Sequence, residues 1–67
     1  MPVAKVTEIS ASSPKGLEDA IQAGITRAGK TLENIRGAWI KDLKVVVGDG
    51  RVTEYRVRMK VTFVLKD

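Results

Sequence analysis

The chain has 67 residues and a net charge of +4. This length allows one domain, residues 1–67, with a small core, so we expect self-association to add to its stability. The absence of Cys and His excludes disulfides, thiolate or imidazole metal sites and the common nucleophile–base pairs, so we expect no enzymatic activity. No apolar run approaches the roughly 20 residues that span a bilayer, and no signal-peptide pattern opens the chain, so we expect a soluble, cytoplasmic protein without a membrane partner.

The first expected element is a strand over residues 3–9, which are rich in β-branched side chains. The polar run 10–13 and Pro14 are expected to end it. Ser13 is a suitable N-cap and Pro14 suits the first helical position, so a helix is predicted to start there.

The helix is the clearest periodic signal in the chain. Apolar residues recur three or four positions apart from Leu17 to Ile35, which places them on one helix face. Gly24 and Gly29 interrupt this pattern, and an interior glycine costs about 1 kcal/mol relative to alanine. Either packing supports the helix at these points, or a neighbouring element comes close there.

A long hairpin is expected to follow. Residues 38–47 have strand composition, and Gly48-Asp49-Gly50 is a strong hairpin turn. Residues 53–66 then alternate between mostly apolar odd positions and mostly charged even positions, which predicts one face under the helix and one polar face. The predicted fold class is α+β, with the order β-α-β-β and a three-stranded antiparallel sheet wrapped on one helix.

The second strand of this hairpin has apolar residues at both parities. Trp39, Leu43, Val45 and Val47 share one parity, and Ile40 and Val46 share the other. A strand that is apolar on both faces in so small a protein predicts a subunit interface.

Basic residues are concentrated in the second half of the chain. Residues 35–67 have eight basic and four acidic side chains, whereas residues 1–34 have four of each. Such a patch is either a solvated strand face or a site for nucleic acid, acidic lipid or a small phosphate ligand. Sheets that bind RNA expose aromatic side chains between basic ones, but Tyr55 and Phe63 are expected on the apolar face, so we expect no nucleic-acid partner.

Five segments of the chain are informative when taken together: Ser12-Ser13-Pro14-Lys15, Leu17-Glu18-Asp19-Ala20-Ile21-Gln22, Arg27-Ala28-Gly29-Lys30-Thr31-Leu32, Glu54-Tyr55-Arg56-Val57 and Lys60-Val61-Thr62-Phe63-Val64-Leu65. They resemble the dodecin family, and the resemblance covers nearly the whole chain. The resemblance implies a hollow homododecamer built from trimers, which in many members stores a flavin, FMN or riboflavin, between subunits without acting as a flavoenzyme.

The ligand-binding residues that the resemblance implies are only partly present. Flavin-binding members stack a tryptophan on the flavin ring at the position of Gly37 and hydrogen-bond the ring with a glutamine at the position of Arg56. An acidic residue near the ribityl chain has its counterpart in Asp42. Trp39 follows Gly37 by two residues and should project to the same face of the strand, so it is either a ring-stacking residue or a core or interface anchor.

Arginines of the third strand offer a second way to hold a flavin. Arg56 can stack on a ring or bind a phosphate through its forked donors, and its alternative role is a solvated or inter-subunit ion pair. Arg58 and Lys60 are expected on the same face as Arg56. The candidate ligand-binding residues are therefore Gly37, Trp39, Asp42, Arg56 and Arg58. The alternative is a dodecin-type assembly that binds little or no flavin and holds a metal ion or a coenzyme A-like phosphate compound, with the metal-binding residues unknown.

Overall fold

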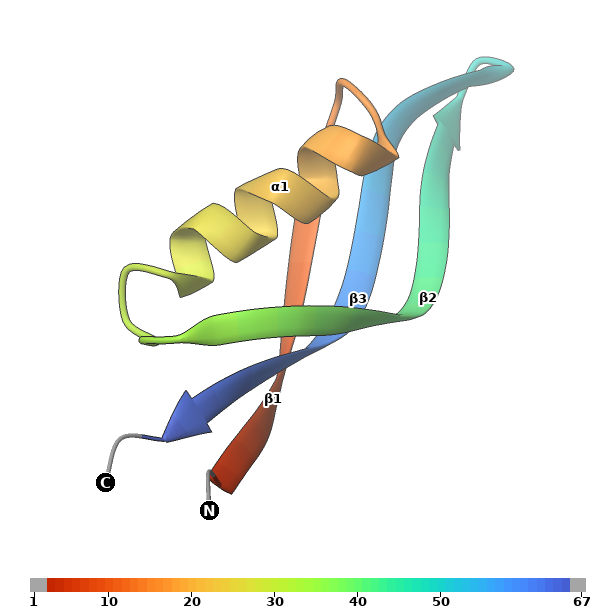
Figure 1. Ribbon diagram of the computed structural model, residues 1–67. Coiled ribbons are helices and arrows are strands. Elements are labelled where there is room, and N and C mark those ends of the chain that lie inside the picture. The colour runs from red at the N-terminus through yellow and green to blue at the C-terminus, as the bar shows by residue number, and fades with distance from the viewer. Residues whose placement is uncertain (1–2, 66–67) are drawn as a thin grey trace.

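The computed structural model describes residues 3–65 and has the expected β-α-β-β order (Figure 1). Its elements are β1 (Val3–Ser13), α1 (Leu17–Ala28), β2 (Ile35–Gly48) and β3 (Arg51–Leu65). All strand pairs are antiparallel, and the strand order β1-β3-β2 places the last strand at the centre of the sheet. The predicted hairpin turn is present, with Asp49 and Gly50 in the left-handed region at φ 51° and 74°. Lys66, at the end of the predicted third strand, lies outside the described residues.

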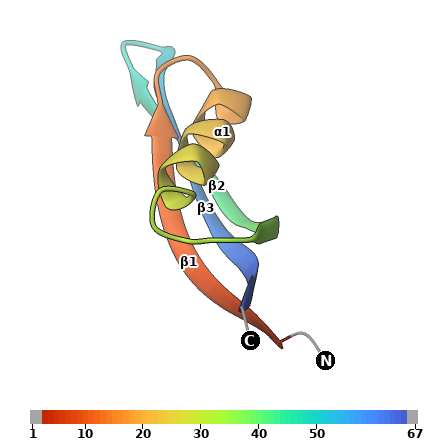
Figure 2. The ribbon, with the colours of Figure 1, turned by 60° about the vertical axis from the view of Figure 1, so that its left-hand side comes forward.

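The alternation of β3 separates the two faces of the sheet as predicted. Val57, Met59, Val61 and Phe63 are buried, and α1 packs against β1 and β3, where Ala20 joins Val57 and Met59 in one core cluster (Figures 1 and 2). On β1, the odd residues from Val3 to Ser13 pair directly with odd residues of β3 and therefore share the face under the helix. The even residues of both strands form the opposite, open face.

The boundary between β1 and α1 is not where the sequence pattern predicts it. Residues 10–13 continue β1 because they pair with residues 55–58 of β3, and α1 begins at Leu17 with Gly16 at its N-cap. The prediction that Ser13 caps the helix and that Pro14 is its first residue is therefore wrong. Ser13 is buried instead; its hydroxyl donates to the Asp19 carboxylate and accepts a hydrogen bond from the backbone N–H of Lys15. It fastens the first turn of α1 to the end of β1.

The helix also ends earlier than the apolar period predicts. α1 stops at Ala28, Gly29 follows as its C-cap, and the N–H groups of Thr31 and Leu32 both donate to the carbonyl of Ala28. Asn34 then takes a positive φ of 60°, and its carbonyl accepts a hydrogen bond from the N–H of Val64. This bond draws the chain into the sheet, so β2 begins at Ile35 instead of residue 38.

Gly24 marks a close approach of α1 to the sheet. A Cβ atom at this position would lie 2.5 Å from Cε of Met59 and 3.0 Å from Cβ of Ala11. Of the two explanations open for this glycine, a close neighbour is therefore confirmed. Gly24 and Ala20 are buried in this contact, where Met59 is also fully buried.

β2 contains a β-bulge that changes which of its residues share a face. Its register against β3 shifts between Ile40 and Asp42, so that Lys41 is the extra residue. Ile40 pairs with Met59 before the bulge and Leu43 pairs with Val57 after it, which puts both on the helix side of the sheet. The prediction that Trp39 shares a face with Leu43 and Val45 is therefore wrong, because a bulge reverses the alternation.

Within residues 3–65, no helix combines the length and apolar character needed to cross a membrane.

Candidate ligand-binding face

The predicted ligand-binding residues all lie on the open face of the sheet. Directly paired residues of neighbouring antiparallel strands project to the same side. Gly37 pairs with Thr62 and Trp39 with Lys60; beyond the bulge, Asp42 pairs with Arg58 and Lys44 with Arg56. Because Arg56, Arg58, Lys60 and Thr62 are even residues of β3, their partners on β2 share the face opposite α1. The expectation that Gly37 and Trp39 share a face is confirmed.

The bulge at Lys41 is what brings Trp39 and Asp42 to the same face, although they are three residues apart. An unbroken strand would place one on each side. The extra residue shifts the parity, and the Lys41 side chain reaches across the central strand to Glu8 of β1. The ammonium nitrogen of Lys41 lies 3.3 Å from Oε2 of Glu8.

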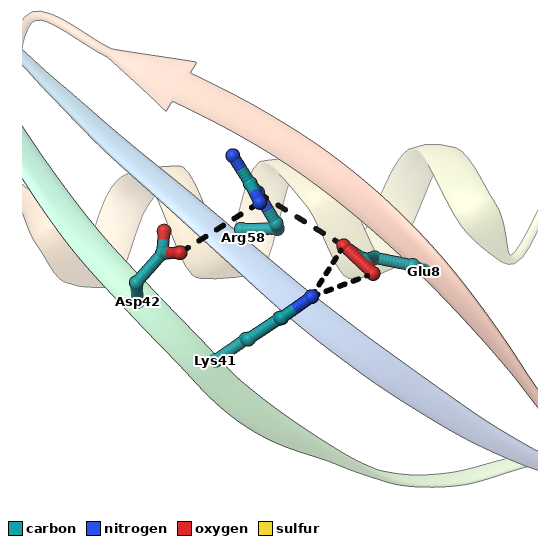
Figure 3. A network of polar contacts seen from close by, with 4 residues as sticks. All are labelled: Glu8, Lys41, Asp42 and Arg58. Atoms are coloured by element: carbon teal, nitrogen blue, oxygen red, sulfur yellow. Dashed lines mark hydrogen bonds and ion pairs between the residues drawn. The ribbon is translucent and has the colours of Figure 1, made fainter.

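Charged side chains of three strands form a connected network on this face (Figure 3). Arg58, on the central strand, lies 3.9 Å from the Glu8 carboxylate and 3.8 Å from that of Asp42, and Lys41 also contacts Glu8. Figure 3 shows these side chains in front of the sheet with the helix behind it. All of them are partly exposed, so each pair contributes at most about 1 kcal/mol. The network orders the side chains of Asp42 and Arg58 relative to each other.

A groove of about 490 Å³ lies beside this network, over the ends of the strands nearest the hairpin tip. Its polar lining comes from all three strands: Ser10, Ser12, Asp42, Lys44, Glu54, Arg56 and Arg58. Three cationic and two anionic side chains therefore surround it. The sequence predicted Asp42, Arg56 and Arg58, but not the residues of β1, Lys44 or Glu54. The parity of β1 identifies Ser10 and Ser12 only once its pairing with β3 is known.

Arg56 is held by an ion pair within its own chain. Its Nε lies 3.1 Å from Oε1 of Glu54, and its Nη2 lies 3.5 Å from Oε2. These hydrogen bonds from Arg56, followed by one from Ser12, lower the pKa of Glu54. Of the roles open for Arg56, an ion pair is thus present, formed with a residue of the same strand. A guanidinium has five N–H donors, so Arg56 retains donors for a ligand anion while bound to Glu54.

Trp39 is not part of the core of the chain. Its side chain is 75% exposed, beside Lys60 on the open face. Gly37, two residues earlier, leaves open space, since no atom lies within 4 Å of a Cβ built on it. A flat indole with free space beside it, on the same face as a cationic groove, fits a ligand that combines an aromatic ring with a phosphate.

Comparison with known proteins identifies the family. The family model for dodecin matches residues 3–66. The chain belongs to the dodecin family. The dodecin of Thermus thermophilus is 38% identical to it over 65 residues, which are 97% of this chain and 94% of that protein. The resemblance seen in the sequence is thereby confirmed.

Solved dodecin structures share the fold. The structure of the dodecin from Streptomyces davaonensis superposes with a TM-score of 0.93 at 35% identity and covers 98% of this chain and 97% of its own. The calcium dodecin of Mycobacterium tuberculosis, described as a calcium-chelating immunodominant antigen with a calcium-binding site, has a TM-score of 0.81 at 28% identity and covers 96% of this chain and 91% of its own. None of these names describes a catalytic activity.

Proposed function

We propose that this dodecin binds a flavin, FMN or riboflavin, between the subunits of a hollow dodecameric shell in the cytoplasm, and that it stores the ligand without transforming it. Membership of the dodecin family and the matching fold support self-assembly. The observation that carries the ligand assignment is the exposed Trp39 on the same face as the groove of Lys44, Arg56 and Arg58. The indole supplies a stacking surface for the ring, and the cations supply donors for the phosphate of FMN.

Within this proposal each residue has a defined role. Trp39 stacks on the isoalloxazine ring, and Gly37 leaves the space that the ring enters. Asp42 accepts hydrogen bonds from the ribityl hydroxyls, while Arg56 and Arg58 contact the phosphate. Because Glu54 and Asp42 compensate part of the positive charge, FMN should bind only moderately more tightly than riboflavin, and the difference should shrink as salt rises.

The direct test is to titrate FMN, and separately riboflavin, with the assembled protein and to measure the loss of flavin fluorescence. Trp39→Ala should weaken flavin binding about ten- to hundredfold, since stacking of a base on an aromatic side chain is worth about 1–3 kcal/mol. Trp39→Phe, which keeps a flat ring, is the matched control and should retain part of the affinity. Light scattering must show that both variants assemble like the parent protein.

A second ligand class is supported by the groove itself. A coenzyme A-like phosphate compound would use the same cations, Lys44, Arg56 and Arg58, without requiring Trp39. If no flavin is quenched by the parent protein while such a compound binds, the flavin proposal is wrong and this alternative replaces it. A metal ion is less well supported within one chain, because residues 3–65 contain no group of three or more acidic side chains placed to hold one.

A further inference from the structure

Lys41 stands between the two parts of the proposed ligand site. Paired residues of the three strands form rows across the open face, and consecutive rows are about 6.6 Å apart, since each strand advances two residues from one row to the next. One row is Glu8, Lys60 and Trp39, and the next, which lines the groove, is Ser10, Arg58 and Asp42. Lys41 is the bulge residue between these rows on β2. A ligand whose ring stacks on Trp39 and whose tail runs into the groove therefore passes Lys41.

The Lys41 side chain crosses the sheet toward β1. Figure 3 shows it passing in front of β3, with its ammonium group beside the Glu8 carboxylate. The ammonium nitrogen donates to both carboxylate oxygens of Glu8, at 3.3 and 3.4 Å. In this position Lys41 lies across the way from Trp39 to the groove, and its charge is directed to Glu8 instead of to a ligand.

The ion pair between Lys41 and Glu8 can be exchanged at low cost. The two side chains are 43% and 39% exposed, and ion pairs in such surroundings are weak. Glu8 has a second cationic neighbour, because Nε of Arg58 lies 3.9 Å from its Oε1. When Lys41 leaves, Glu8 therefore keeps a positive partner. A phosphate monoester carries about −1.5 to −2 charges at neutral pH, so it attracts the ammonium group more strongly than one carboxylate does.

We infer that Lys41 is a further ligand-binding residue, which exchanges the Glu8 carboxylate for the phosphate of the ligand. The side chain turns toward the groove when a phosphate comes to lie beside Arg58, and Lys41 and Arg58 then contact the same phosphate. Glu8 competes with that phosphate for Lys41 and so determines how strongly the site prefers a phosphate-bearing flavin. The inference rests on the proposed function for the flavin, but the phosphate contact itself can be tested without one.

A double-mutant cycle between Lys41 and Glu8 tests this exchange, with the affinities of the assembled protein for FMN and for riboflavin as readouts. Lys41→Met, which keeps a long side chain without its charge, should weaken FMN binding about five- to tenfold. Lys41→Arg, which keeps the charge, should retain most of the affinity. Glu8→Gln should strengthen FMN binding by up to about fivefold, because the competing carboxylate is gone. Riboflavin has no phosphate and should bind these variants and the parent protein alike.

Glu8→Gln in the Lys41→Met background separates the exchange from its alternatives. If Lys41 moves from Glu8 to the phosphate, most of the gain in FMN affinity disappears in this background. An equal gain in both backgrounds would overturn the inference, since Glu8 would then act through its charge alone. Weaker binding of both flavins by each single variant would also overturn it, because the ion pair would then only brace the bulge. Lys15→Met and Glu18→Gln make the same changes of charge near the N-terminal end of α1 and, as matched controls, should leave FMN binding nearly unchanged.

Inorganic pyrophosphate gives a readout without flavin, by calorimetric titration at low salt, where the attraction between exposed charges is least screened. The same cycle should give the same pattern of losses and gains. If the parent protein binds no flavin but pyrophosphate follows this pattern, the flavin proposal is wrong and the inference about Lys41 stands. If FMN binds the parent protein and the cycle is additive, the inference is wrong and the flavin proposal stands. A parent protein that binds neither flavin nor pyrophosphate would overturn both.

Discussion

Replacing Gly24 by alanine should destabilise the protein, although the same change stabilises most helices. Alanine at an interior helix position gains about 1 kcal/mol over glycine. Its Cβ would meet Cε of Met59 at 2.5 Å and Cβ of Ala11 at 3.0 Å. The end of the Met59 side chain can rotate away, but Ala11 is fixed in β1, so the helix must move outward. Overpacking of this kind costs about 1–3 kcal/mol, which leaves a net loss of up to about 2 kcal/mol.

Gly29→Ala is the matched control. Gly29 has right-handed helical angles, φ −63° and ψ −15°. A Cβ there would have as its nearest neighbours only the carbonyl oxygens of Ile25 and Thr26, at 3.3 and 3.5 Å. These are carbonyls of the preceding helical turn, so the substitution should be accommodated. We expect Gly29→Ala to stabilise the protein by up to about 1 kcal/mol, through helix propensity and a less flexible unfolded chain.

Thermal unfolding, monitored by circular dichroism, compares the two variants. Both are measured at the same chain concentration, because assembly contributes to the measured stability. A change of 1 kcal/mol corresponds to about 4–8 °C in Tm for a domain of this size. The transitions should move in opposite directions. If Gly24→Ala raises the Tm as much as Gly29→Ala does, the close packing of α1 on the sheet at Gly24 is refuted.

Three further substitutions test other parts of the structure. Met59→Ala leaves a cavity at a fully buried position and should lower the free energy of unfolding by about 2–5 kcal/mol in denaturant titrations. An effect below about 1 kcal/mol would contradict the place of Met59 in the core. Ser13→Ala should cost about 1 kcal/mol by removing the hydrogen bonds that join β1 to α1, and Ser10→Ala, on the open face, should cost much less. The pKa of Glu54 is lowered in the folded state, so its pairing with Arg56 stabilises the protein above the ordinary pKa of glutamate, and this contribution is lost as the pH falls through the lowered pKa. Glu54→Gln should therefore reduce the loss of unfolding free energy on the acid side of a pH series, and an unchanged pH dependence would contradict the pairing.

The local patterns of the sequence determined the elements and the two faces of the central strand. A period of two over residues 53–65 places alternate side chains on opposite sides of a strand wherever that strand lies. The burial of Val57 and Val61 and the exposure of Arg56 and Arg58 could therefore be predicted from β3 alone. The same holds for the existence of α1, because its apolar residues recur at helical spacing. The shared face of Arg56 and Arg58, and hence part of the candidate site, followed directly.

Only the tertiary structure decided the features that depend on pairing between distant segments. The apolar period continues to Ile35, but α1 ends at Ala28, because the hydrogen bond between Asn34 and Val64 draws the next residues into the sheet. Residues 10–13 look like a strand break, yet they remain in β1 because β3 supplies their hydrogen-bond partners. Neither partner is near in sequence, so no local pattern records it.

The bulge at Lys41 shows the same limit within the candidate site. A bulge arises from the register of two strands, and the sequence of β2 carries no strong mark of it. It reverses the parity of everything that follows, and so brings Trp39 and Asp42 to one face and leaves Ile40 and Leu43 on the other. The composition of both surfaces was present in the sequence, but the pairing with β3 determined which residues form each of them.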